Sequence, residues 1–169
     1  SPGGAAINFT GAVNADDASA NNRTLVVDAG TAGVVTISAA IGDTQALADL
    51  DVTAATINLN HATVNVNDDN AGAATATFTG AVALGANTVT VTTDKATGTD
   101  SSVTFASPVN ADNATANNRA LVVTAGTGTV TYTNVGATEP LADLDVTGAT
   151  INLKGTSVTV NDGAGGATA

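Results

Sequence analysis

The chain has 169 residues, of which 43% are hydrophobic but only 2% aromatic, and four basic against 15 acidic residues give a net charge of −11. So acidic a chain is poorly suited to nucleic acids and anionic membrane surfaces, which both attract basic proteins. The absence of cysteine excludes disulfides, thiolate metal sites and cysteine catalysis.

Apolar and polar residues alternate in short stretches along the chain. In 56–59, for example, the two apolar residues occupy alternate positions. This period of two predicts β-strands with one buried face. Clusters of Gly, Asn, Asp and Ala interrupt the stretches about every 7–12 residues, and no helical period or membrane-spanning run is present. The same alternation occurs in 63–67, 87–92 and 157–160.

A long internal repeat accounts for most of the sequence. Residues 8–31 align with 104–127 at an offset of 96, and 47–60 align with 141–154 at an offset of 94. We therefore expect one continuous segment over 1–169. It contains a first copy at 8–103 and an incomplete second copy at 104–169.

A shorter phrase lies inside the long repeat. NFTGAV at 8–13 returns as TFTGAV at 77–82 and as TFASPV at 104–109, and the three phrases hold all three Phe of the chain. Each long repeat is therefore expected to consist of smaller related units, as in repeat proteins.

A parallel β-helix explains these repeats better than tandem immunoglobulin-like β-sandwiches, the alternative fold. Such sandwiches usually centre on large residues, often a Trp, and this chain has no Trp. Leu25 to Leu47 is 22 residues and Leu121 to Leu141 is 20, close to a coil of roughly 20–25 residues in a β-solenoid. Four such coils would make the long repeat.

Stacking supplies each coil with the cover that it needs. One coil cannot bury its own Val, Leu and Ile, so it requires coils above and below. Uncovered end coils are adhesive edges. We therefore expect copies of the chain to join end to end, or further repeats of the same chain to follow. The residues expected to point inward, together with their copies, are Leu25, Val27, Leu50, Val52, Ile57, Leu59, Val64 and Val66.

Several phrases carry a resemblance to a known family: TFTGAVALGANTVTVT, VTFASPVNAD, LVVTAGTGTVTY and PLADLDVTGATINLKGTSVTV. They resemble the β-strand repeats of very large bacterial surface proteins, the filamentous-haemagglutinin-like adhesins. The resemblance implies a right-handed parallel β-helix, secretion to the cell surface, and a role as the shaft of an adhesin or extracellular filament. A host, cell-surface or glycan ligand is the implied partner. Because it carries over no catalytic residue, we predict a structural protein and not an enzyme.

Acidic turns provide the candidate metal sites. Carboxylate oxygens are ligands that calcium favours. The second copies are less acidic, since Asn and Gly replace Asp17 and Asp69, so ordinary Asx turns are the preferred interpretation and no cofactor is expected. The calcium candidates are Asp16, Asp17, Asp68 and Asp69.

The longest polar loop, 14–24, recurs at 110–120. It either contacts a ligand or neighbouring fibre, since loops carry binding, or it is held down by an ion pair. In the second case we expect Arg23 to pair with Asp16 or Asp17, and Arg119 to pair with Asp112. The candidate contact residues are Asp16, Asn21, Asn22, Arg23, Asp112, Asn117, Asn118 and Arg119.

Carboxylates suggest a rival function, a polysaccharide-acting β-helix enzyme. Asp49 and Asp51 recur as Asp143 and Asp145. Side chains two apart on a strand lie about 6.5–7 Å apart, which overlaps the carboxylate spacing of inverting glycosidases. Because both pairs belong to the repeat, a solvated acidic row is the preferred interpretation.

Two remaining features involve threonine and histidine. Thr88, Thr90 and Thr92 would suit an ice- or surface-binding face only if neighbouring coils present Thr in register. His61 is the only His of the chain, so no second imidazole exists for a metal site or triad. We expect it to be an exposed residue at a strand end.

Overall fold

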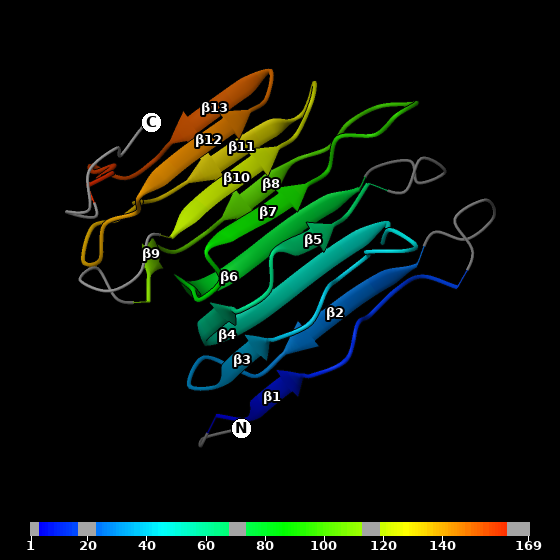
Figure 1. Cartoon of the computed structure of the whole chain (residues 1–169), viewed down its shortest axis with the longest axis horizontal. Helices are drawn as coiled ribbons and strands as arrows, with labels where there is room; N and C mark the ends of the chain where they lie inside the picture. Colours follow the sequence, from blue (N-terminus) through cyan, green and yellow to red (C-terminus); the bar gives the residue numbers. More distant parts are fainter. Residues whose placement is uncertain (1–3, 17–22, 68–73, 113–118, 162–169) are drawn as a thin grey trace.

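A computed structural model describes residues 4–16, 23–67, 74–112 and 119–161 (Figure 1). These residues form thirteen β-strands and no helix, and every pair of strands among them is parallel. The chain winds through about five turns of a β-solenoid. The predicted solenoid is thus confirmed. The alternative of tandem immunoglobulin-like sandwiches is wrong, because such sandwiches consist of antiparallel sheets.

Each turn contributes to three strips of sheet, which we call faces 1, 2 and 3. Face 1 holds β2 (Thr24–Asp28), the first half of β4 (Asp49–Leu59), the first half of β6 (Thr75–Leu84), β8 (Val103–Phe105), β11 (Thr129–Tyr132) and β13 (Thr150–Leu153). Face 2 holds β1 (Ala6–Phe9), β3 (Val34–Ile37), the second halves of β4 and β6, and β9 (Val109–Ala111). Face 3 holds β5 (Thr63–Asn65), β7 (Thr88–Thr92), β10 (Ala120–Thr124) and β12 (Asp143–Thr147).

The strands β4 and β6 turn the corner between faces 1 and 2 without a loop, which joins these faces into one nine-stranded sheet. Their pairing register shifts between Thr53 and Thr56, as at a β-bulge. In β6 the corner is at Gly80, with φ of 150°. A Cβ there would lie 2.1 Å from the carbonyl oxygen of Ala54, so only glycine allows the two strands this close an approach.

Apolar side chains of successive turns lie over one another in columns. In the face 1 column, Phe78, Phe105 and Tyr132 are buried and stacked, with ring centroids 5.1 and 5.2 Å apart. Rings in such contact add to the burial energy of their area. The face 1 column is Val27, Val52, Phe78, Phe105, Tyr132 and Leu153. The face 2 column is Ile7, Val35, Ile57, Val82, Val109, Val135 and Val158. The face 3 column is Val13, Ile41, Val64, Val91, Val123 and Val146.

The long repeat does not equal four turns, contrary to expectation. Four turns along face 2, from Ile7 to Val109, take 102 residues, six more than the offset of 96. Equivalent strands therefore lie on different faces, with β2 on face 1 and its copy β10 on face 3. The spacing between paired residues varies from turn to turn, from 19 between Leu141 and Val160 to 32 between Val91 and Val123.

Local contacts between turns are nevertheless repeated. The amide of Ala48 donates to the carbonyl of Arg23 at 2.8 Å, and the amide of Ala142 donates to that of Arg119 at 2.8 Å. The Asn14 side chain accepts from the Thr44 amide at 3.0 Å, and Asn110 accepts from the Thr138 amide at 3.0 Å. The repeat thus encodes how one turn contacts the next, and not where on the circumference that contact lies.

Burial of the expected core residues depends on the presence of a covering turn. In the first copy the predicted residues are buried, except Leu25, which is half-buried. In the second copy Leu121 and Val123 are buried, but the residues of the last turn are not. Leu144 and Val146 are half-buried, while Ile151, Leu153 and Val158 are 52%, 48% and 42% exposed.

Replacing Phe105 by Ala is expected to lower the free energy of unfolding by about 3–5 kcal/mol, because it leaves a cavity between two stacked rings. Urea denaturation followed by circular dichroism measures the change. Val26→Ala is the control, since Val26 points outward with 69% exposure and should change the free energy by no more than about 0.5 kcal/mol. Equal losses in both variants would contradict the columns.

Candidate functional site

The predicted ion pairs of the two polar loops are present. Arg23 donates through Nε and Nη2 to the two carboxylate oxygens of Asp16, at 2.7 and 2.8 Å. Arg119 donates in the same way to Asp112, at 2.8 and 3.1 Å. Both pairs have the two-bond fork geometry that fixes a guanidinium against a carboxylate. The hydrogen bonds to Asp16 raise the pKa of Arg23.

The two ion pairs differ in their surroundings. The side chains of Arg23 and Asp16 are 51% and 61% exposed, while those of Arg119 and Asp112 are 10% and 38% exposed. Arg119 also donates through Nη1 to the side-chain oxygen of Asn87 at 2.8 Å, and Asn87 lies in the preceding turn. Arg119 therefore links two turns, whereas Arg23 lies near the N-terminal end of the solenoid.

Several candidate residues fall outside the described part of the chain. These are the contact candidates Asn21, Asn22, Asn117 and Asn118 and the calcium candidates Asp17, Asp68 and Asp69. The contact role of the loops and calcium binding by these residues therefore stay predictions. Of the calcium candidates, Asp16 is described, and it engages Arg23. Within the described ranges, no three His, Cys, Asp or Glu residues come together as a metal site.

The two pairs of carboxylates lie on different faces of the solenoid. Asp49 and Asp51 lie on face 1, where Asp49 accepts a hydrogen bond from the Thr75 hydroxyl. Asp143 and Asp145 lie on face 3, next to Ala120 and Val122. The two pairs are on different faces because the repeat does not complete a whole number of turns.

The condition for a Thr face is met only in part, and His61 differs from expectation. Thr92 is in register with Thr124, but Thr88 and Thr90 lie beside Ala120 and Val122, so neighbouring turns do not all present Thr in register. His61 follows the end of β4 and is half-buried, not exposed. Its Nδ1 accepts a hydrogen bond from the Thr63 amide at 3.2 Å, so the imidazole stabilises a turn.

One polar connection was not singled out from the sequence. Between β7 and β8, Asp100 accepts hydrogen bonds from the Lys95 amide at 2.8 Å and from the amide and hydroxyl of Thr127 at 2.7 and 2.9 Å. The donors, the Thr127 amide first, lower the pKa of Asp100. Asp100 thus fastens its loop to the next turn. The sequence signal is the polar run 93–102, in which Lys95 and Asp100 lie five residues apart.

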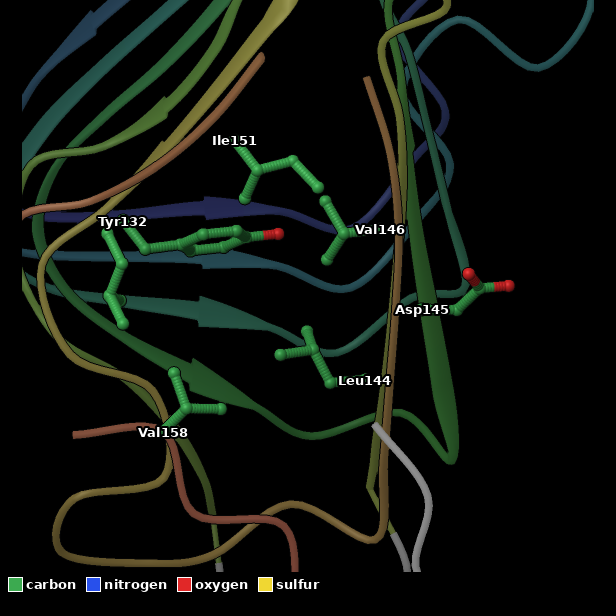
Figure 2. A pocket seen from close by; sticks show the side chains of 7 residues that line it. Tyr132, Leu144, Asp145, Val146, Ile151 and Val158 are labelled. Atoms are coloured by element: carbon green, nitrogen blue, oxygen red, sulfur yellow. The ribbon is translucent and has the colours of Figure 1, made fainter. Parts of the chain in front are cut away.

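The C-terminal end of the solenoid, formed by β12, β13 and Val158, is open and apolar. It contains a cavity of about 340 Å³. The buried Tyr132 hydroxyl points into this cavity and has no hydrogen-bond partner among the described residues (Figure 2). Burial raises the pKa of this phenol. The cavity is lined by Tyr132, Leu144, Asp145, Val146, Ile151, Leu153 and Val158.

The opposite end of the solenoid is also incompletely covered. Ile7, Phe9, Val13 and Leu25 point toward the core but are only half-buried. β1 pairs with β3 alone, and β2 pairs with β4 alone. Both ends therefore present apolar side chains beside unpaired strand edges, the surface on which another strand can add.

Comparison of the chain with family models, curated proteins and solved structures finds no match. Within the described residues there is no helix of the length and hydrophobicity needed to cross a membrane. What the described residues define is therefore the fold, a β-solenoid whose two ends no other described residue covers.

The repeat supplies a matched pair of variants for the loop ion pairs. Arg119→Ala is expected to lower the free energy of unfolding by about 1–3 kcal/mol, because it leaves Asp112 and Asn87 without their buried donor. Arg23→Ala should cost much less, because its pair with Asp16 is exposed to water and such pairs contribute little to stability. Urea denaturation of both variants measures the difference, and an equal cost would contradict the role of Arg119 between turns.

The hydrogen bonds of Asp100 predict a pH dependence of stability. Because its pKa is lowered in the folded state, its contribution is present above the unfolded value of about 3.9 and is lost as the pH falls through the folded value. Asp100→Asn should therefore be less stable than the parent at neutral pH, and this difference should shrink below about pH 4. Denaturation at several pH values measures it. A constant difference would show that the charge is unimportant.

Proposed function

We propose that the chain is a structural segment in the shaft of a secreted bacterial adhesin or extracellular filament. The observation that supports this most directly is the set of apolar columns, which continue from the first turns to the last. A solenoid lengthens by the addition of turns without a change in cross-section. It therefore suits a protein that must extend from a surface.

The arrangement of hydrogen bonds supports a stiff shaft. Successive turns are joined by parallel ladders on all three faces, and the bonds run along the axis because they connect one turn to the next. To bend such a body, the ladder on one side must be stretched while the packed interior is compressed on the other. Protein interiors are close-packed and resist such compression.

Charge supports exposure of this shaft to water. The net charge of −11 keeps molecules apart along their sides. Among the described strands, edges without any bridge to a neighbouring turn lie at the two ends. In this proposal the partners are further turns end to end. A host, cell-surface or glycan ligand is the further partner in this proposal.

Antibodies raised against the purified chain test the proposed location. Intact, unpermeabilised cells of the source organism should be labelled, and immunogold electron microscopy should place the label on extended surface structures. Antibodies preabsorbed with the chain are the control. Label that requires permeabilised cells would contradict the proposal.

Sugar release by the purified chain, abolished in Asp49→Asn or Asp51→Asn, would replace the proposed shaft with the polysaccharide-acting enzyme.

One observation favours a second candidate function, an ice- or surface-binding face. Thr77, Thr104 and Thr131 are in register on three neighbouring turns of face 1, with a spacing of about 4.8 Å along the axis. Thr131 is only 9% exposed, so little of this row is accessible to a crystal surface. Thermal hysteresis of a solution of the chain, lost in Thr104→Val, would establish this second function.

A further inference from the structure

The contact between β4 and β6 shows how the fold covers a turn. The apolar residues Leu50, Val52 and Ile57 of β4 are in register with Ala76, Phe78 and Val82 of β6. All six are buried. The corner of this contact is the close approach of Gly80 to the Ala54 carbonyl.

Among the described residues, nothing covers the copy of β4 in the second repeat in this way. At the offset of 94, Leu144, Val146 and Ile151 correspond to Leu50, Val52 and Ile57. They belong to β12 and β13, which pair on one edge only. The cavity of about 340 Å³ and the unpartnered Tyr132 hydroxyl are at this place (Figure 2). The surface of β12 and β13 therefore corresponds to the surface of β4 that β6 covers within the chain.

The N-terminal segment resembles in sequence the strand β6, which covers β4. AAINFTGAV at 5–13 matches ATATFTGAV at 74–82, with six of nine residues identical. Its inward residues Ile7, Phe9 and Val13 are only half-buried. β1 pairs with β3 and leaves its other edge unpaired.

Gly11 supplies an independent observation. It matches Gly80, for which a Cβ would meet the Ala54 carbonyl oxygen. Around Gly11 itself a Cβ would find no atom within 4 Å, and its φ is not positive. Nothing among the described residues of the single chain therefore requires glycine at this position. In the second copy, Gly148 occupies the position of Ala54. A contact of Gly11 with the Gly148 carbonyl, like that of Gly80 with the Ala54 carbonyl, would admit only glycine at position 11.

We propose that the N-terminal segment 5–13 of a second copy of this chain docks on the C-terminal end, in the register of β6 on β4. Ile7 then lies over Leu144, Phe9 over Val146 and Val13 over Ile151. Gly11 forms the corner against Gly148. This rests on the proposed function, since it names the contact through which shaft segments join.

Outward residues provide a direct test of this register, because the chain has no native cysteine. The register places Asn8 of one copy beside Asp145 of the other, as Thr77 lies beside Asp51. Neighbouring strands are about 4.8 Å apart, a separation that a disulfide spans. The double variant Asn8→Cys with Asp145→Cys should form covalent oligomers under oxidising conditions, and reductant should cleave these cross-links.

Two double variants serve as controls for the cross-link. Asp51→Cys with Thr77→Cys should close within one chain and give no oligomers. Asn8→Cys with Asp143→Cys, shifted by two residues, should cross-link far more slowly. Equal rates for the two intermolecular variants would overturn the register. A monomeric product from the Asn8 and Asp145 variant would overturn the docking, with residues 162–169 of the same chain or a further turn of a longer chain as the occupant.

Gly11→Ala separates docking from folding. It should leave the unfolding of the single chain unchanged, but weaken self-association by at least about tenfold, because the new methyl group meets a backbone carbonyl in the docked state. Sedimentation over roughly a hundredfold range of chain concentration measures both the parent and the variant. Association unaffected by Gly11→Ala would overturn the contact.

A mixing experiment completes the test. Phe9→Asp blocks the N-terminal end and Ile151→Asp blocks the C-terminal end, so each variant alone should stay monomeric and their mixture should stop at dimers. Longer oligomers in the mixture would overturn head-to-tail docking. A chain that stays monomeric while antibodies label the cell surface would refute this inference alone, whereas oligomers without surface label would refute the shaft and leave the docking intact.

Discussion

Axial stacking of like apolar side chains is the interaction on which this structure depends. Each turn is too thin to bury its own Val, Leu and Ile, and it becomes stable only between two neighbours. The interior is therefore a set of columns, and the stacked rings of Phe78, Phe105 and Tyr132 are the largest members of one of them. The same rule explains the two ends, where the same residue types are half-buried or exposed because no further turn of the described residues covers them.

The long repeat preserves the contacts between neighbouring turns, although its two copies lie on different faces of the solenoid. β2 and β10 have almost the same sequence but lie on different faces, because every face presents an apolar column to the interior. A strand therefore needs only a neighbour with matching alternation, and not a particular position on the circumference. Polar contacts obey this rule as well, since Asn14 and Asn110 accept equivalent hydrogen bonds on different sides of the solenoid.

The sequence was sufficient for the strands, their inward residues and the ion pairs of Arg23 and Arg119, because these follow from period-two alternation and from charges within one loop. It was insufficient for the number of turns per repeat, since turn length varies with loops that leave no periodic signal. The role of Asp100 was missed because its partner Thr127 lies a full turn away, a distance that local patterns do not encode.

The rotation of the repeat has a consequence for what the solenoid displays. The Arg23 loop leaves the corner between faces 3 and 1, whereas its copy at Arg119 leaves the corner between faces 2 and 3. In an array of such repeats with a constant step, equivalent loops would follow a spiral and return to the same side after every third repeat. A fibre of this kind would offer its loops to all directions, so it could engage a surface without first orienting itself.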